Sequence, residues 1–319
     1  MKQPTIPIFF ACDNAYIPFL AVALESLEKN AGRQYHYDIK ILHVNSITEA
    51  NMAKIIKRYQ VENFAIEFVD IKETLQQFND KLHVRDYYSK TTYYRLFVPK
   101  LYPQYKKALY LDSDVVVLGD VSRLYQTPLG RNLVGAITDE AVQNVPAFCE
   151  YVINRIGVKT PRHYFNAGIL LMNLQRLREI DFEKVFLSLI DRITFDVAQD
   201  QDYLNAICRD RVKYITGRWD KMPFPNPRIK EKDIKLLHFN LDQKPWQKEG
   251  ILYEKYFWEY ARQTEYYDEI MAHRKNYTAE QVAASQAQTV NLIAKAKVQA
   301  DETAENQRIA QAIKEVCQF

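Results

Sequence analysis

The sequence predicts an α/β protein with a mostly parallel sheet, helices on both faces of the sheet, and a helical C-terminal extension. In the first 110 or so residues, short apolar segments alternate with segments of helical period. This alternation is typical of parallel strands joined by helices. The last stretch, 276–319, has no Gly or Pro and is rich in Ala, Gln, Glu and Lys, which favours a long helix or a broken pair of helices.

The expected elements follow this pattern along the chain. Strands are expected at 6–13, 37–45 and 64–70, with helices at 18–32 and 48–60 between them. A helix is expected at 89–103, with Ser89 as its N-cap and Pro99 near its end, and one long apolar strand at 106–120. The second half is more mixed: strands at 132–140, 211–223 and 234–240, a strand passing into a helix at 164–178, and a helix at 199–210. We expect a catalytic domain at 1–262 and a helical extension at 263–319.

Composition narrows the class of protein. A chain of 319 residues with 47% hydrophobic residues can bury a sizeable core. The net charge of +3 is too balanced to indicate a nucleic-acid partner. Only 8 residues are Gly, and neither GxGxxG nor GxxxxGK[ST] occurs, which argues against a Gly-rich phosphate loop. Four scattered cysteines, no signal peptide and no apolar run of transmembrane length favour the cytoplasm.

Two carboxylates interrupt the apolar segment at 106–120. Asp112 and Asp114 are two residues apart, so on an extended strand they would point to the same side, with Ser113 opposite. An ionised carboxylate is unfavourable in an apolar setting unless a cation meets it. Two oxygen ligands suit Mg²⁺ or Mn²⁺, whereas an ordinary strand-end turn is the alternative interpretation.

Other polar residues stand where strands end or helices begin. Asp13 ends the first expected strand, at the edge where open α/β sheets bind ligands. His238 lies near the end of the strand expected at 234–240, and Lys244 comes soon after it. A histidine there is a natural metal ligand, and the lysine is a natural phosphate partner. A structural histidine and a solvated surface lysine are the ordinary alternatives. Asp200 and Gln201 open the helix at 199–210, where acidic residues also serve as simple caps.

Six segments, taken in order, resemble the family-8 retaining glycosyltransferases, which include bacterial lipopolysaccharide galactosyl- and glucosyltransferases and glycogenin. They cover about three quarters of the chain and read FFACDNAY, TTYYRLFVPKL, ALYLDSDVVVLGDVSRLY, YFNAGILLMNL, QDQDYLNAI and HFNLDQKPW. The resemblance implies a GT-A fold with a Rossmann-like nucleotide half. It implies Mn²⁺-dependent transfer of a hexose, with Mg²⁺ as the alternative ion. The donor would be UDP-glucose or UDP-galactose and the acceptor a glycan or glycolipid of the cell surface.

The resemblance also assigns roles to individual residues. The implied metal ligands are Asp112, Asp114 and His238, and the implied diphosphate contact is Lys244. Residues implied for the uracil and ribose are Asp13 and Tyr16. Those implied around the donor sugar are Arg95, Asn166, Asp200 and Gln201, with Asp139 lining the sugar and acceptor side. Of these, Asp200 or Gln201 is the candidate nucleophile, with Gln201 better suited to stabilise the cationic centre through its amide oxygen.

The sequence departs from the family at Leu241, where the family often has Gly, and the tail has no counterpart that we can place. Three other functions stay open: glycogenin-like self-glucosylation, a nucleotidyltransferase, and a catalytically inactive UDP-sugar-binding relative. The identity of the hexose and the oligomeric state also stay open. So does the choice between a covalent intermediate and same-face attack, and so does a peripheral contact with the inner face of the membrane.

Overall fold

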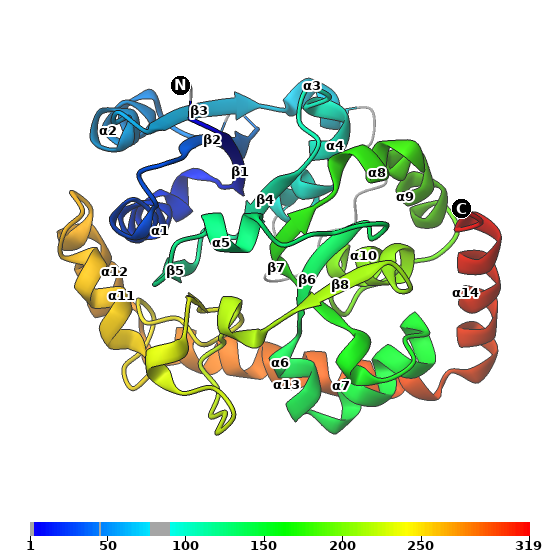
Figure 1. Cartoon of the computed structure of the whole chain (residues 1–319). Coiled ribbons are helices and arrows are strands. Elements are labelled where there is room, and N and C mark those ends of the chain that lie inside the picture. The colour runs from blue at the N-terminus through cyan, green and yellow to red at the C-terminus, as the bar shows by residue number, and fades with distance from the viewer. Residues whose placement is uncertain (1–2, 45, 77–89) are drawn as a thin grey trace. The chain divides into compact units, whose positions relative to one another are not determined.

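The structure, a computed structural model, describes residues 3–44, 46–76 and 90–319 (Figure 1). The chain forms two compact units, each discontinuous in sequence. Unit 1 comprises residues 1–73, 108–127 and 216–286, and unit 2 comprises residues 74–107, 128–215 and 287–319. The predicted N-cap Ser89 lies outside the described residues. The boundary between a catalytic domain and a helical extension, predicted at residue 262, lies inside unit 1 and stays a prediction.

The sheet of unit 1 confirms the predicted parallel arrangement. Its strands are β1 (Thr5–Ala11), β2 (His36–His43), β3 (Phe64–Asp70) and β4 (Ala108–Leu111), in the order β3-β2-β1-β4. Each neighbouring pair is parallel. The strands β1, β2 and β3 lie side by side in Figure 1. The strand order reverses between β1 and β4, as in Rossmann-like sheets, where ligands bind beyond the carboxyl ends of the strands at this point.

The connecting helices begin and end close to the predicted residues. The helix α1 (Ile17–Asn30) has a proline in its first turn, which favours helix initiation, and α2 (Glu49–Tyr59) begins after Thr48. The Thr48 Oγ1 atom accepts a hydrogen bond from the Asn51 backbone N at 3.3 Å, which caps the helix. Residues Ile17 to Leu27 of α1 are all buried, so this helix forms much of the core of unit 1.

The apolar segment at 106–120 does not form the single strand that we predicted. Strand β4 ends at Leu111, the chain turns at residues 112–114, and β5 (Val115–Val117) then pairs antiparallel with β9 (Leu236–His238) in a separate two-stranded sheet. The Ser113 Oγ atom donates a hydrogen bond to the carbonyl of Ala11 at 2.9 Å, which fixes the turn against the end of β1. The two carboxylates therefore lie in a strand-end turn, and Ser113 is buried rather than exposed.

The remaining elements of unit 1 are helical. They are α5 (Ser122–Tyr125), α11 (Glu254–Ala261), α12 (Tyr267–Asn276) and 3-10 turns at Asn14–Tyr16, Gly217–Trp219 and Glu231–Asp233. The ring of Trp246, after β9, stacks on Phe19 of α1 at 4.1 Å between centroids and lies 5.0 Å from Phe257 of α11. This aromatic cluster fixes the loop after β9 to the helices of unit 1.

Unit 2 contains three strands of the seven-stranded sheet, and their pairing is mixed. Its strands are β6 (Val134–Thr138), β7 (Phe165–Met172) and β8 (Val212–Ile215), in the order β7-β6-β8, with β7 antiparallel and β8 parallel to β6. The predicted strand at 211–223 is shorter than expected, because β8 ends at Ile215. The helices of this unit are α4 (Val98–Leu101), α6 (Glu140–Asn144), α7 (Pro146–Tyr151), α8 (Leu174–Glu179), α9 (Phe182–Ile190), α10 (Asp200–Cys208) and α14 (Thr303–Val316), with a π-helical turn at Val152–Ile156 and a 3-10 turn at Pro161–His163.

The helix predicted at 89–103 is wrong in type. Residues Lys90–Phe97 form a 3-10 helix, and the short α4 follows it. Pro99 lies in the first turn of α4 instead of near a helix end, because proline lacks only an N–H that is unpaired there anyway. Two helices span the boundary between the units in sequence, α3 (Lys72–Gln76) and α13 (Ala279–Asp301).

The C-terminal tail forms the broken pair of helices that the sequence allowed, α13 and α14. Arg155, after α7, donates to Glu302 Oε2 at 2.9 Å and to Asn306 Oδ1 at 3.1 Å. Helix α14 also packs against α9, and it lies at the red end of the chain in Figure 1. These polar contacts dock α14 within unit 2. Within the described ranges, no helix combines the length and apolarity needed to cross a bilayer.

Candidate active site

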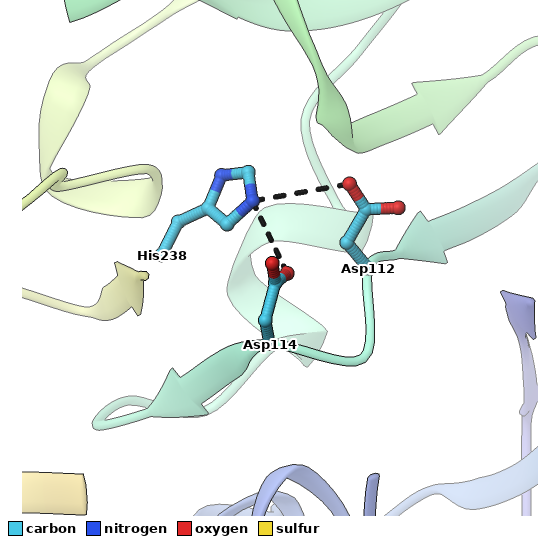
Figure 2. Close-up of side chains that lie close together, drawn as sticks. All are labelled: Asp112, Asp114 and His238. Atoms are coloured by element: carbon cyan, nitrogen blue, oxygen red, sulfur yellow. Dashed lines mark ion pairs between the residues drawn. The ribbon is translucent and has the colours of Figure 1, made fainter. Parts of the chain in front are cut away.

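Asp112, Asp114 and His238 converge in unit 1 (Figure 2). His238 Nε2 lies 3.3 Å from Asp114 Oδ1 and 3.8 Å from Asp112 Oδ2. The antiparallel pairing of β5 with β9 places His238 opposite Val115, and the Phe239 backbone N donates to the Asp114 carbonyl at 3.0 Å. Strand pairing therefore brings a distant histidine beside the two carboxylates.

These three residues fit a divalent cation. One candidate ligand atom from each lies within 4.8 Å of the others, and two carboxylate oxygens with one imidazole nitrogen form a donor set suited to Mn²⁺ or Mg²⁺. Within the described part of the chain, the buried Asp114 Oδ1 forms no closer polar contact than its 3.3 Å approach to His238 Nε2. A buried carboxylate oxygen in this state has a lone pair available for a cation.

Asp220 orients the histidine, and the sequence reasoning missed it. Its Oδ1 lies 3.0 Å from His238 Nδ1, and its side chain is fully buried. This contact turns Nε2 toward Asp112 and Asp114, as carboxylates behind metal-binding histidines do. Burial by itself lowers the pKa of His238, but Asp114 and Asp220 outweigh it and raise this pKa to about 10. No local motif marks Asp220, because only the tertiary pairing of its segment with β9 brings it to the histidine.

Lys244 meets a carboxylate of this cluster instead of lying on the surface. It is 6% exposed, donates to Asp114 Oδ2 and lies 5.4 Å from the centre of the Trp246 ring. Burial lowers the pKa of Lys244, but the charge of Asp114 outweighs it, so the pKa is raised. Burial likewise raises the pKa of Asp114, but Lys244 and His238 hold it well below its usual range. The chain itself therefore supplies part of the positive charge that the carboxylates require.

The two residues predicted for the nucleoside lie near this cluster. Asp13 follows β1, and its Oδ1 accepts a hydrogen bond from the Tyr16 backbone N at 3.1 Å. The charge of Lys244 lowers the pKa of Tyr16, but burial and the charges of Asp114, Asp13 and Asp112 outweigh it and raise this pKa. The structure thus brings together all six residues predicted for metal, diphosphate and nucleoside in unit 1.

A second cluster, in unit 2, brings together residues predicted for the donor sugar and acceptor side. Asp139 follows β6 and caps α6 through its Oδ1, which accepts from the Val142 N at 3.0 Å. Its Oδ2 accepts from Asn166 Nδ2 of β7 at 3.1 Å and from Gln201 Nε2 of α10 at 3.0 Å. One buried carboxylate therefore fixes two side-chain amides.

Arg95 and Asp200 form a buried ion pair in the same unit. Arg95 Nε lies 3.1 Å from Asp200 Oδ2, both side chains are about 95% buried, and Arg95 Nη1 donates to the Ala167 carbonyl. A cationic side chain buried to this extent requires such an anionic partner. The residue before Asp200 is Gln199, which has φ of 47°, an uncommon backbone conformation that sets the first turn of α10.

Leu241 lies three residues after His238, in the loop that follows β9. Its φ is 51°, in the left-handed region that favours Gly. The sequence departs from the family pattern at this position, yet the backbone keeps the conformation that a Gly would adopt. At Leu241 the loop therefore adopts a backbone conformation that Gly would adopt without strain.

Comparison with known proteins identifies the family. The profile of glycosyl transferase family 8 matches residues 7–250. The chain belongs to glycosyl transferase family 8. This family-8 protein is 23% identical to general stress protein A of Bacillus subtilis over 265 residues, which are 77% of this chain and 88% of that protein. It is 28% identical to glycosyltransferase GlyB of Streptococcus pneumoniae over 220 residues, 68% of this chain and 48% of that protein.

Solved structures confirm the GT-A fold of this family-8 protein. The galactosyltransferase LgtC, in complex with donor and acceptor sugar analogues, matches with a TM-score of 0.67 and 28% identity, over 82% of this chain and 96% of that one. The bifunctional glycosyltransferase WbbM matches with a TM-score of 0.73 and 25% identity, over 86% of this chain and 52% of that one. Membership makes the chain a glycosyltransferase, and the Asp112–Asp114–His238 cluster is its candidate divalent-metal site.

Proposed function

We propose that this protein is a retaining hexosyltransferase that moves glucose or galactose from a UDP-sugar to a glycan or glycolipid of the cell surface, with Mn²⁺ as cofactor. The observation that carries the proposal is the cluster of Asp112, Asp114 and His238 with Lys244 at the carboxyl end of β4. A bound cation and a lysine beside it are what a leaving diphosphate requires. The LgtC galactosyltransferase, 28% identical, supports a hexose donor.

The residues of unit 1 would bind the UDP moiety. Asp13 and Tyr16 would hold uracil and ribose, and Asp112, Asp114 and His238 would hold the ion. When bound, Mn²⁺ supplies positive charge to the diphosphate oxygens. Lys244 would donate to the same diphosphate, exchanging its contact with Asp114 for one with phosphate. After the exchange the ammonium group still has an anionic partner, because phosphate replaces the carboxylate.

The residues of unit 2 would bind and orient the hexose. Arg95, Asn166 and Asp139 would donate to and accept from its hydroxyls. Gln201 would place its amide oxygen at the electron-poor anomeric carbon as UDP departs. Asp200 is the alternative nucleophile, although its ion pair with Arg95 neutralises the carboxylate. Retention follows either from a covalent intermediate or from same-face attack, in which the leaving phosphate takes the acceptor proton.

All four cysteines are free, which supports the reducing cytoplasm as the compartment. An acceptor at the inner face of the membrane would be reached there.

A panel of UDP-sugars, read as UDP release, tests class, donor and metal together. We expect turnover with UDP-glucose or UDP-galactose and Mn²⁺, background rates in excess EDTA, and an α-anomeric product by NMR. Asp112→Asn should reduce turnover to background. The matched control is Asp38→Asn, which removes a carboxylate paired with Lys40 on β2 at 2.7 Å and should leave turnover intact. Full turnover in EDTA would refute the metal assignment.

The same assay separates the alternatives. Release of pyrophosphate from a nucleoside triphosphate and a sugar phosphate would indicate a nucleotidyltransferase. Mass increments of one hexose on the protein after incubation with UDP-glucose would indicate self-glucosylation. UDP binding without turnover of any donor would indicate an inactive relative.

A further inference from the structure

Unit 2 contains a third polar cluster, which consists of Asp202, Tyr164 and Tyr151 and adjoins Gln201. No role was assigned to these three residues from the sequence. The Asp202 side chain is completely buried and accepts three hydrogen bonds. Tyr164 Oη donates to its Oδ1 at 2.7 Å, and Tyr151 Oη and the Ala198 N donate to its Oδ2 at 2.8 and 2.9 Å. Tyr164 and Tyr151 are each 1% exposed. Such a satisfied network holds each member in one orientation.

Only one of the two tyrosines reaches Gln201. Tyr164 Oη accepts a hydrogen bond from Gln201 Nε2 at 3.2 Å, whereas Tyr151 bonds to Asp202 without contacting Gln201. A tyrosine hydroxyl has a single proton. Because Tyr164 gives that proton to Asp202, its oxygen can only accept, and the group that faces it must be the Gln201 NH₂.

The other contacts of Gln201 agree with this orientation. Its Nε2 also donates to Asp139 Oδ2 at 3.0 Å, and its Oε1 accepts from the Ala167 N at 2.8 Å. Both amide protons therefore have acceptors, and Oε1 keeps its second lone pair. Gln201 is partly exposed, while Tyr164 and Asp202 behind it are buried.

We propose that Asp202 and Tyr164 are positioning residues for Gln201, a role that rests on the function proposed above. The Asp202–Tyr164–Gln201 relay fixes which end of the Gln201 amide faces each neighbour, so that the oxygen, not the NH₂, is presented to the anomeric carbon. Asp202 does not touch substrate, because its carboxylate is enclosed by the two tyrosines and the turn that precedes α10.

The relay makes a specific prediction for Asp202→Asn. The asparagine oxygen should remain with Tyr151 and Ala198, which are two donors, so its NH₂ should face Tyr164. Tyr164 then accepts from the asparagine and turns its proton toward Gln201, whose NH₂ can no longer donate to it. In this variant Tyr164 therefore disfavours the wild-type orientation of the Gln201 amide, whereas Asp139 still favours it.

The test compares Tyr164→Phe with Tyr151→Phe, two buried variants that each remove one donor to Asp202. We expect Tyr164→Phe and Asp202→Asn to lower kcat by about tenfold or more with the donor KM unchanged, because Gln201 acts in the transition state. Tyr151→Phe should keep kcat within about threefold of wild type, since positioning of Gln201 is intact. An equal loss in Tyr151→Phe and Tyr164→Phe, or no loss in either, would overturn the proposal.

A second readout does not depend on activity. The side-chain amide resonances of Gln201, assigned in ¹⁵N-glutamine-labelled protein by their absence in Gln201→Glu, should shift in Tyr164→Phe and Asp202→Asn but not in Tyr151→Phe. Unshifted resonances in the first two variants would refute the relay. If wild type turns over no UDP-sugar, the proposed function fails, and these resonances still decide whether the relay orients Gln201. If Tyr164→Phe does not fold, the comparison of Asp202→Asn with Tyr151→Phe tests the proposal by the same two readouts, kcat and the Gln201 amide resonances.

Discussion

Replacing Lys244 by Met separates the electrostatic role of this lysine from any role in binding phosphate. The side chains of Lys244 and Asp114 are 7% and 12% exposed, so the variant leaves a largely buried carboxylate without its ammonium partner. Removing one partner of a buried ion pair typically costs about 3–5 kcal/mol. His238 Nε2 stays 3.3 Å from Asp114 Oδ1. At an effective dielectric of 20 that contact keeps roughly 5 kcal/mol of attraction, so we expect the lower end, about 3 kcal/mol of lost stability.

Tryptophan fluorescence during urea unfolding in EDTA measures this loss in the relevant part of the chain. The three tryptophans, Trp219, Trp246 and Trp258, all belong to unit 1, so the signal reports on the unit that contains the ion pair. EDTA removes any stabilisation by a bound metal, which would otherwise add to the free energy of unfolding.

A double-mutant cycle and a control complete the test. Lys244→Met combined with Asp114→Asn removes the stranded charge, so it should be more stable than Lys244→Met alone by at least about 1 kcal/mol. Lys248→Met breaks a more exposed pair with Asp242, at 2.8 Å and 20% and 14% exposed, and should cost less than about 1 kcal/mol. The electrostatic reasoning is wrong if Lys244→Met costs no more than Lys248→Met, or if the double variant is no more stable than the single one.

Four further predictions follow from the structure. Burial raises the pKa of Asp202 from 3.8 to about 6, so its contribution to stability is full below pH 4, and about 3 kcal/mol is lost as the pH rises through 6. In urea titrations Asp202→Asn should lack this loss, and equal pH profiles would contradict it. Asp220→Asn should weaken Mn²⁺ binding about 10- to 100-fold by calorimetry, and unchanged affinity would show that the contact is not needed. Leu241→Gly should stabilise unit 1 by about 1 kcal/mol in the fluorescence assay, since φ is 51° there; destabilisation would argue against strain. Arg155→Met should speed amide exchange in 303–316, because it removes two contacts that dock α14; unchanged protection would count against that docking.

Local pattern was enough to predict the sheet of unit 1. The parallel strands, the helices between them and the position of Asp13 beyond β1 follow from hydrophobic period and from capping residues, which act over a few neighbouring residues. The same kind of reasoning failed at 106–120. A continuous apolar run does not show where a strand ends, and here the chain turns at 112–114 because Ser113 bonds to Ala11 of another strand.

Sequence also determined which residue types take part in the candidate site. Asp112, Asp114, His238 and the polar residues at the start of α10 stand out as charges and ligands in apolar surroundings, and a resemblance in six ordered segments assigned them to one family. Their partners did not stand out. Tyr164 in particular looks like any aromatic residue before a strand.

Only the tertiary structure decided those partnerships. The pairing of β5 with β9 brings His238 to Asp114, the fold places Asp220 behind the histidine, and Lys244 is buried against a carboxylate instead of being solvated. Each contact joins residues far apart in sequence, and its strength depends on burial and on the hydrogen bonds around it. A local sequence pattern predicts neither the burial of a side chain nor the hydrogen bonds around it, because both depend on how the whole chain packs.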